Sequence, residues 1–411
     1  MQCKLFYCMK IAILSTAVAI MSGCDDELSF VNTPPGSIVI NGDICDICGG
    51  DWVSLSGEAE DPDGDQISYE WAVSGGTLDP ADGKGQSVLW TAPAEAGYYK
   101  VKLTVTDGID RKSSYIYVQV MSLFPDIAEY ETLTLDDPTV TYVIKGGMAE
   151  VPIHSELRIG AGIKIYVSGS SSGLDVEGGA LIIEGESGAK VTIGPSECSA
   201  EGRWNGISLG NSSVAEITHM NLYSAKEGIS LDDAELFISN SNIFDNTKYG
   251  INANYTSKAE ITDCDIHDNG TGINVSNSNV SVTACILRNN LYAGIAVDQD
   301  SGAVEEHNVE ITECSISGNE YDGIRVISAA EPVIRQCAIY MNGMPPAGYA
   351  IRLLYYKIET VIDAEYNYWG TTDEEEIAEL IYDHNDNPIL MGTVKFDNYL
   401  SSSPVMRGAV E

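Results

Sequence analysis

The sequence predicts an all-β chain in which a parallel β-helix follows a smaller β-sandwich. Two observations lead to this prediction. A Gly-Ile pair recurs every 22 residues in the second half of the chain, and short alternating strands with Gly, Pro and Asp turns fill residues 32–121. A fixed period of this length is typical of stacked repeats, each of which buries its apolar face against its neighbours.

Each repeat contains three short apolar pairs rather than a helical pattern. In residues 259–275 the two members of each pair are separated by one residue: Ala259/Ile261, Cys264/Ile266 and Ile273/Val275. Alternation of this kind predicts strands with one buried face. Three strands per repeat leave no room for a helix, so each repeat should form one triangular coil, stacked on the next at about 4.8 Å.

Two further columns of residues recur through the repeats, one of cysteine and one of asparagine. Free Cys behaves as a small buried hydrophobe. Asn tolerates the left-handed conformation of a tight bend, and stacked amides can hydrogen-bond along an axis. We therefore predict that both columns are structural rather than ligand-binding: Cys264, Cys285, Cys314 and Cys337, and Asn246, Asn269, Asn290, Asn319 and Asn342.

The composition is strongly acidic. Lys and Arg number 22 against 61 Asp and Glu, which gives a net charge of −39. Nucleic acid is therefore excluded as a partner, because phosphate binding needs clustered cations. The acidity is typical of a protein that stays soluble outside the cell or in a saline habitat. It should also repel an anionic polysaccharide unless a cation such as Ca²⁺ bridges the two.

The N-terminus carries an export signal. Lys4 and Lys10 precede an apolar run that is too short to span a bilayer permanently. The residues Met21-Ser22-Gly23-Cys24 resemble a bacterial lipobox, and this resemblance implies that Cys24 is the lipidated first residue of the mature protein. We therefore expect a signal peptide at 1–23, a tether at 24–31 and a lipid-anchored place in the bacterial cell envelope, on either face. Ordinary secretion is the alternative.

Residues 32–121 show the pattern of an immunoglobulin-like β-sandwich, with short strands, turns and a Trp on a central strand. The segments Asp61–Asp65, Ser68–Trp71 and Lys100–Gly108 resemble PKD-type domains of bacterial surface proteins. Residues 122–142 contain two prolines and several acids, and we interpret them as a linker.

Two small motifs in the sandwich could have a specific role. Cys45 and Cys48 form a C-x-x-C pair with no second pair for a zinc site, so a local disulfide is predicted. Asp61, Asp63 and Asp65 place alternate carboxylates in a turn, as Ca²⁺ sites do. A turn with solvated acids is the alternative, and Ca²⁺ is the one cofactor that the sequence suggests.

The β-helix is expected to span 143–400 and to end in a cap that contains a short amphipathic helix between Asp373 and Asp383. Trp204-Asn205-Gly206-Ile207, the later Gly-Ile pairs and Asn367-Tyr368-Trp369-Gly370 resemble secreted right-handed parallel β-helix repeat proteins of the pectate-lyase-like superfamily. The resemblance implies about ten coils. It assigns no activity, because this architecture occurs in lyases, hydrolases, adhesins and proteins without catalysis.

A candidate glycan-binding face lies where the repeat changes. Outward positions between the Gly-Ile columns are small and neutral until Arg325 and Arg352, and a longer loop with several acids follows Val297. Arg pairs carboxylates bidentately, and sugar rings stack on aromatic faces. The candidate residues are therefore Arg325, Arg352, Asp298, Asp300, Tyr349 and Tyr355.

No catalytic residue is predicted. The paired Asp and Gly-His-Gly pattern of polygalacturonases is missing, and the five histidines show no metal or triad spacing. The sequence therefore favours a non-catalytic binding or adhesion role, with contact to polysaccharide, extracellular matrix or an envelope protein. A Ca²⁺-dependent polysaccharide lyase and a purely structural envelope protein are the two alternatives.

Overall fold

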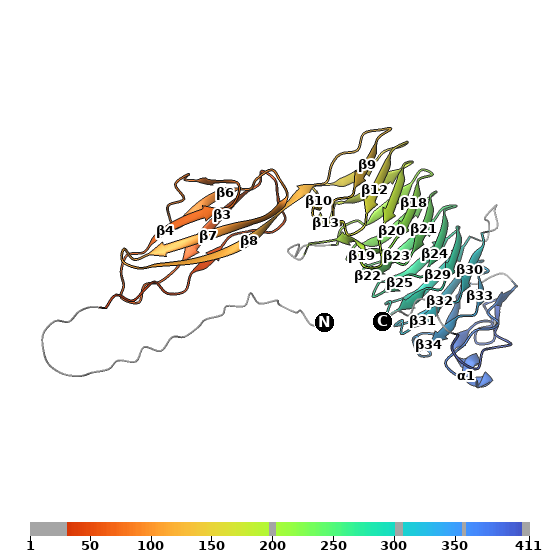
Figure 1. The fold of residues 1–411 in the computed structure, drawn as a ribbon. Coiled ribbons are helices and arrows are strands. Elements are labelled where there is room, and N and C mark those ends of the chain that lie inside the picture. The colour runs from red at the N-terminus through yellow and green to blue at the C-terminus, as the bar shows by residue number, and fades with distance from the viewer. Residues whose placement is uncertain (1–30, 197–202, 301–306, 356–358, 405–411) are drawn as a thin grey trace, which may run out of the picture. The chain divides into compact units, whose positions relative to one another are not determined.

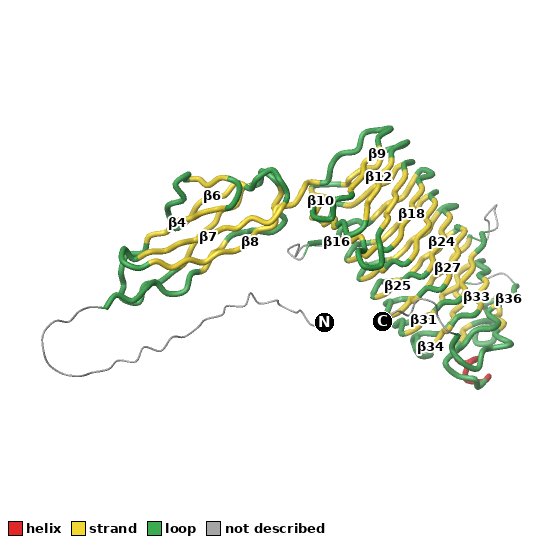
Figure 2. The backbone as a smooth tube through the Cα atoms, viewed as in Figure 1, coloured by secondary structure: helices red, strands yellow, loops and turns green. Residues whose placement is uncertain are grey.

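The computed structural model describes residues 31–196, 203–300, 307–355 and 359–404. The chain divides after Val120 into two compact units, and both are built almost entirely of strands (Figures 1 and 2). The predicted signal peptide and Cys24 lie outside the described residues. Within the described residues, no helix is long and apolar enough to cross a membrane.

The first unit is the predicted β-sandwich. Its core holds Leu55, Trp90 and Leu103, all with no exposed surface, and Trp71 at 3%. Antiparallel strands form its two sheets. One sheet has the order β1 (Val39–Asn41), β3 (Trp52–Glu58), β6 (Ser87–Thr91), β5 (Thr77–Asp79), and the other contains β4 (Ser68–Val73), β7 (Gly97–Thr106), β8 (Arg111–Leu123) and β2 (Ile47–Cys48).

The predicted disulfide between Cys45 and Cys48 is wrong. Cys45 is disulfide-bonded, but Cys48 is not its disulfide partner; Sγ of Cys48 lies 3.9 Å from the carbonyl oxygen of Asp46. The physical reason is the different burial of the two side chains. Cys48 is buried in strand β2, whereas Cys45 is exposed in the loop before it.

The second unit is a β-helix of three parallel sheets, which the chain visits in turn in every coil (Figure 1). The first sheet runs β9 (Thr132–Leu135), β12 (Glu156–Gly160), β15 (Ala180–Glu184), β18 (Val214–Thr218), β21 (Glu235–Ser239), β24 (Lys258–Thr262), β27 (Asn279–Thr283), β30 (Val309–Thr312), β33 (Val333–Arg335). The second runs β10 (Thr141–Lys145), β13 (Lys164–Ser168), β16 (Val191–Gly194), β19 (Met220–Tyr223), β22 (Asn242–Phe244), β25 (Asp265–His267), β28 (Ile286–Arg288), β31 (Ser315–Ser317), β34 (Ala338–Tyr340).

The third sheet contains the Gly-Ile column. Among the described residues it has ten strands: β11 (Met148–Val151), β14 (Gly173–Glu177), β17 (Ile207–Gly210), β20 (Glu227–Asp232), β23 (Tyr249–Asn254), β26 (Thr271–Ser276), β29 (Ala293–Gln299), β32 (Asp322–Ser328), β35 (Ile351–Leu354), β37 (Ile381–Tyr382). Register pairs Ile251 with Ile273 and Ile273 with Ile295. All three side chains are fully buried, as the 22-residue period predicts.

The β-helix begins earlier than the sequence suggested. Strand β9 lies inside the segment predicted as a linker, and it pairs in parallel with β12. Leu135 of β9 is 2% exposed and belongs to the β-helix core. The prolines that suggested a linker, Pro125 and Pro138, lie outside this strand, so they do not interrupt its hydrogen bonds.

The cysteine column is an internal row of thiols, as predicted. Cys264, Cys285, Cys314 and Cys337 are buried and carry free thiols. Burial raises the pKa of Cys285 and Cys314 well above its usual range. A thiol must ionise to bind a metal or act as a nucleophile. The buried thiols instead bond to the backbone: Sγ of Cys285 donates to the carbonyl oxygen of Thr283 at 3.3 Å and accepts the N–H of Cys264 at 3.5 Å.

The asparagine column forms a continuous ladder of side-chain amides. Nδ2 of Asn269 donates to Oδ1 of Asn290 at 3.1 Å, and Nδ2 of Asn290 donates to Oδ1 of Asn319 at 3.0 Å. Oδ1 of Asn290 also accepts the backbone N–H of Asn269 at 3.0 Å. The side chains thus satisfy backbone groups that the bend between the second and third sheets leaves unpaired.

The glycines of the Gly-Ile column leave room for this ladder. A Cβ atom on Gly250 would lie 2.6 Å from the carbonyl oxygen of Gly272 and 3.1 Å from Nδ2 of Asn269. Any side chain there would push the coils apart. The Gly and Asn columns are therefore one structural device.

The cap is close to the prediction, although its helix is shorter. Helix α1 spans Glu374–Glu379, and Oδ1 of its N-cap residue Asp373 accepts the N–H groups of Glu375 and Glu376. Ile377 is fully buried against the last coils. The predicted apolar face continues into strand β37 rather than a further turn, and β36 (Val361–Asp363) pairs with β38 (Thr393–Lys395) beside it.

The ladder predicts a large cost for Asn290→Ala. The substitution leaves buried amide and carbonyl groups unpaired, each at a cost of about 1–3 kcal/mol. We expect urea denaturation to show a loss of about 3 kcal/mol in the free energy of unfolding. The control is Glu260→Ala at an exposed position of β24, which should change the stability little. An equal effect of both substitutions would contradict the structural role of the ladder.

Candidate functional site

The two arginines singled out by the sequence lie in register on adjacent strands of the third sheet. Arg325 of β32 pairs with Ala296 on one side and with Arg352 of β35 on the other, and Arg352 pairs with Tyr382 of β37. Their side chains are 22% and 20% exposed. Two long cations thus stand side by side at the C-terminal end of the β-helix.

A buried carboxylate, which sequence reasoning missed, holds both arginines. Asp322 at the start of β32 has no exposed side-chain surface. Its Oδ2 accepts Nε of Arg325 at 2.8 Å and lies 2.7 Å from Nη2, and its Oδ1 lies 3.6 Å from Nη1 of Arg352. A buried charge needs such pairing, because water cannot solvate it. Two cations and one anion leave this cluster with one net positive charge.

Tyrosines flank the arginines on both sides. The guanidinium carbon of Arg352 lies 4.8 Å from the ring centre of Tyr349 and 5.6 Å from that of Tyr382, distances typical of cation–π contacts. On the other side, the carbonyl oxygen of Tyr292 accepts Nη2 of Arg325 at 3.2 Å. The ring of Tyr292 stacks on Tyr321 at 6.4 Å.

The two pairs of tyrosines differ in accessibility. Tyr349 is 7% exposed, and its ring packs against Tyr382 at 5.1 Å. Tyr292 and Tyr321 are 48% and 38% exposed. Tyr349 therefore supports the arginines, whereas Tyr292 and Tyr321 can contact a ligand. We call Arg325, Arg352, Tyr292 and Tyr321 the arginine face.

The remaining predicted residues do not join this cluster. Oδ2 of Asp300 accepts Nδ2 of Asn277, and its N–H donates to the same side chain. Asp298 is in register with Ile327 on β32. In the described chain, neither carboxylate forms a hydrogen bond or ion pair with Arg325 or Arg352. Tyr355 is 77% exposed beyond the end of β35.

The missed residues did leave a signal in the sequence. Asp322 occupies a register position held by Tyr249, Thr271 and Ala293 in the preceding coils. An acid thus returns to this column, four coils after Glu227 and one coil before the second arginine. Tyr292 and Tyr321 each stand two residues before the Gly of a Gly-Ile pair. All three would have been found by a comparison, coil by coil, of the residues that directly precede each Gly-Ile pair.

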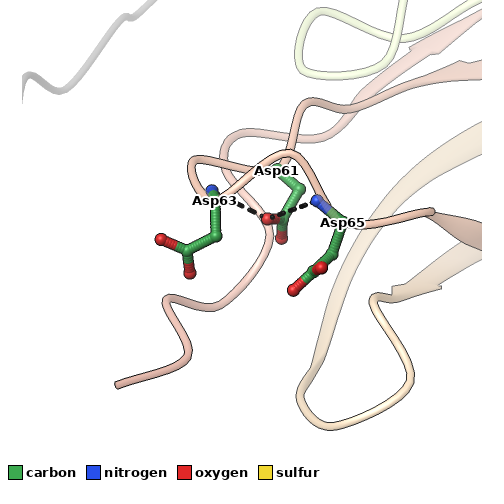
Figure 3. Close-up of side chains that lie close together, drawn as sticks. All are labelled: Asp61, Asp63 and Asp65. Carbon is green, nitrogen blue, oxygen red and sulfur yellow. Dashed lines mark hydrogen bonds between the residues drawn. The ribbon is translucent and has the colours of Figure 1, made fainter. Parts of the chain in front are cut away.

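The three acids of the sandwich turn do come together. One oxygen from each of Asp61, Asp63 and Asp65 lies within 4.8 Å of the others, and Figure 3 shows the three side chains around one bend. Oδ1 of Asp61 accepts the N–H groups of Asp63 and Asp65 at 2.9 and 3.2 Å. Oδ2 of Asp61 is a buried atom without a hydrogen-bond partner. Oxygen donors at this spacing fit Ca²⁺.

These carboxylates also have structural roles. One Asp63 oxygen accepts the backbone N–H of Thr33 at 2.6 Å, and the bonds to Asp61 fix the turn. Asp63 and Asp65 are exposed. In the part of the chain that the structure describes, no other group of three His, Cys, Asp or Glu side chains has this proximity.

The Ca²⁺ hypothesis predicts a heat of binding for the full chain in calorimetry. Weak Ca²⁺ sites in proteins have dissociation constants of about 0.1–1 mM. Asp61→Asn should weaken binding at least tenfold, because it removes one of the three charges. Asp82→Asn, in another exposed turn of the sandwich, is the control. Absence of heat in the unaltered protein would leave only the turn-forming role.

Two protein families match this chain. The family described as right handed beta helix region matches residues 179–339, and the PKD domain family matches residues 46–120. No curated protein matches the sequence. The first region lies within the β-helix and the second within the β-sandwich.

Solved structures with similar folds have very low identity. The periplasmic alginate epimerase AlgG is 11% identical, with coverage of 71% of this chain and 83% of that one and a TM-score of 0.34. The A-module of the Azotobacter vinelandii mannuronan C-5 epimerase AlgE4 is 13% identical, with coverage of 69% of this chain and 91% of that one and a TM-score of 0.33. The Agl-KA catalytic domain is 11% identical, with coverage of 90% of this chain and 95% of that one and a TM-score of 0.37. Similarity at this level assigns no activity to the chain. The two family matches identify the chain as a PKD domain followed by a right-handed parallel β-helix.

Proposed function

We propose that the β-helix binds an acidic polysaccharide, without catalysis, at the arginine face. The observation that supports this most is the charge of the cluster: two guanidinium groups surround the single buried carboxylate of Asp322. Asp322 thus provides one negative charge for two partly exposed guanidinium groups. A ligand carboxylate can supply the missing negative charge and accept paired N–H groups from a guanidinium.

The acidity of the whole chain does not prevent such binding. Charges separated by more than about 8 Å are largely screened at physiological ionic strength. A carboxylate at the arginine face interacts mainly with Arg325 and Arg352, although the net charge of the protein is −39. Acidic side chains farther away therefore have little effect on a carboxylate bound at this face.

The exposed tyrosines fit the apolar side of a sugar ring. Tyr292 and Tyr321 lie next to Arg325, since the Tyr292 carbonyl accepts from its guanidinium. Rigid, partly exposed aromatic rings offer large contact areas at a low cost in conformational entropy. One face therefore provides both an anion partner and a stacking surface, as a uronic acid polymer requires.

Non-catalytic binding of a polysaccharide is better supported than lyase chemistry. A Ca²⁺-dependent lyase would need acidic metal ligands beside a basic side chain. The acid that touches both arginines is Asp322, whose carboxylate is enclosed beneath them. Among the described residues, the group of acids spaced for a metal lies in the sandwich, which is the other unit.

The proposal predicts that Arg325→Gln and Arg352→Gln each weaken binding to polygalacturonate about tenfold, equivalent to about 1.4 kcal/mol. The reason is the loss of one charge-assisted pair in each variant. The measurement is titration calorimetry on folded protein, with melting temperatures checked first. Arg288→Gln is the matched control, because Arg288 also pairs with an aspartate, Asp265, and is 37% exposed.

Two results would contradict the proposal. Unchanged binding in both variants would place the ligand elsewhere, and no binding at all would favour the purely structural alternative. Ultraviolet absorbance of unsaturated products from polygalacturonate or alginate, with and without Ca²⁺, tests the lyase alternative. Product formation that depends on Arg325 would replace the binding proposal.

We also propose that the protein is anchored to a bacterial envelope membrane through lipid on Cys24. The support is the lipobox-like segment that ends in Cys24, outside the described residues. A single acyl chain binds membranes only reversibly, so stable anchoring needs more than one chain.

The anchor predicts a lipid mass on an N-terminal Cys24 of the mature protein. In a bacterial host, Cys24→Ser should move the protein from the membrane fraction to the soluble fraction. Cys48→Ser, at a buried thiol of the sandwich, controls for a general loss of folding. Mass spectrometry that finds an unmodified Cys24 would exclude lipidation.

A further inference from the structure

The outer face of the sandwich carries a group of exposed aromatic side chains. Tyr98 of β7 is 70% exposed, and Tyr115 and Tyr117 of β8 are 55% and 59% exposed. Residues that alternate with them, such as Val101 and Val118, are buried in the core. The three rings thus lie on the side of the sheet opposite the core.

Strand register brings two lysines among these tyrosines. Lys100 is opposite Tyr117, Lys102 is opposite Tyr115, and Tyr98 is opposite Gln119. Directly opposed side chains on an antiparallel pair lie about 5 Å apart, and diagonal neighbours are within reach of aromatic rings. We call Tyr98, Lys100, Lys102, Tyr115 and Tyr117 the tyrosine face.

The tyrosine face contains one edge contact between rings and one cation–π contact over a ring. The rings of Tyr115 and Tyr117 meet at 5.7 Å with an interplanar angle of 79°. Nζ of Lys100 lies 4.0 Å from the centre of the Tyr115 ring. Pairing across the strands therefore orients the side chains, yet each tyrosine stays more than half exposed. A solvated face does not require three such rings.

We propose that the tyrosine face is a second binding surface for acidic polysaccharide. The rings offer stacking surfaces for pyranose units, and the ammonium groups of Lys100 and Lys102 offer partners for their carboxylates. Charge complementarity selects this ligand: two cations lie together here, whereas the chain as a whole has 61 acids and 22 Lys and Arg residues. This inference is independent of the arginine face, which belongs to the other unit.

A second copy of the chain fits the tyrosine face less well. In a two-fold arrangement the same patch meets itself, so the lysines of both copies would approach one another. Each copy also has a net charge of −39, which opposes association. An acidic sugar polymer has the opposite local charge and can extend along the strands.

The test uses the full chain and polygalacturonate, with neutral dextran as the uncharged comparison. We expect Tyr115→Ala/Tyr117→Ala to weaken binding to polygalacturonate at least fivefold, and Lys100→Gln/Lys102→Gln to weaken it and reduce its dependence on salt. Trp52→Ala is the matched control, because Trp52 is a 70% exposed aromatic residue on β3 of the opposite sheet. Circular dichroism and melting temperatures establish that each variant is folded.

Four outcomes would overturn the inference. They are binding in the tyrosine variant equal to that of Trp52→Ala, equal binding to dextran, no binding to polygalacturonate by the unaltered chain, and tyrosine-dependent self-association in sedimentation. The Arg325→Gln/Arg352→Gln double variant separates the two proposals. If only that variant loses binding, the tyrosine face is not a site. If only the tyrosine variant loses binding, the arginine face is not a site.

Discussion

The hydrogen-bonded ladder between successive coils is the constraint on which the β-helix depends. Parallel strands at about 4.8 Å spacing place each side chain directly above its counterpart in the neighbouring coil. The same side-chain amide therefore recurs at the bend before the third sheet, where Asn269 donates to Asn290 and Asn290 donates to Asn319. Gly250 has no room for a side chain, because a Cβ would lie 2.6 Å from the carbonyl oxygen of Gly272 in the next coil and 3.1 Å from Nδ2 of Asn269. Change in one column thus requires change in another.

Residues on the outer face of the sheets do not take part in this ladder, so their side chains can vary from coil to coil. Arg325 and Arg352 occupy such outward positions on the third sheet. Two adjacent cations repel each other, and the structure compensates them with Asp322. The removal of a carboxylate from water costs several kcal/mol, which a stacked scaffold does not require for its own stability. The buried acid, the partly exposed arginines and the exposed Tyr292 and Tyr321 form one arrangement. Its features suit an anionic ligand better than they suit packing.

Residues that repeat were predictable from the sequence, whereas residues that occur once were not. The isoleucine, cysteine and asparagine columns are visible as periods, and the structure places them inside as expected. Asp322 has no period, because its role depends on side chains from two coils. The pairing of Cys45 could not be predicted from spacing, because spacing does not show that Cys48 is buried in β2 while Cys45 is exposed. Strand β9 was missed because its neighbouring prolines resemble a linker.

The proposed binding of an acidic polymer by an acidic protein depends on local charge. The chain has 61 acids against 22 Lys and Arg, so the proposal places the contacts where cations lie together. The arginine face and the tyrosine face each combine cations with exposed tyrosines, and each alone offers few contacts. Binding of one polymer at two linked sites raises the effective concentration of the second contact, and avidity can exceed single-site affinity by about 10²–10⁴. Weak sites on separate units are then sufficient, provided that the polymer is long enough to reach both.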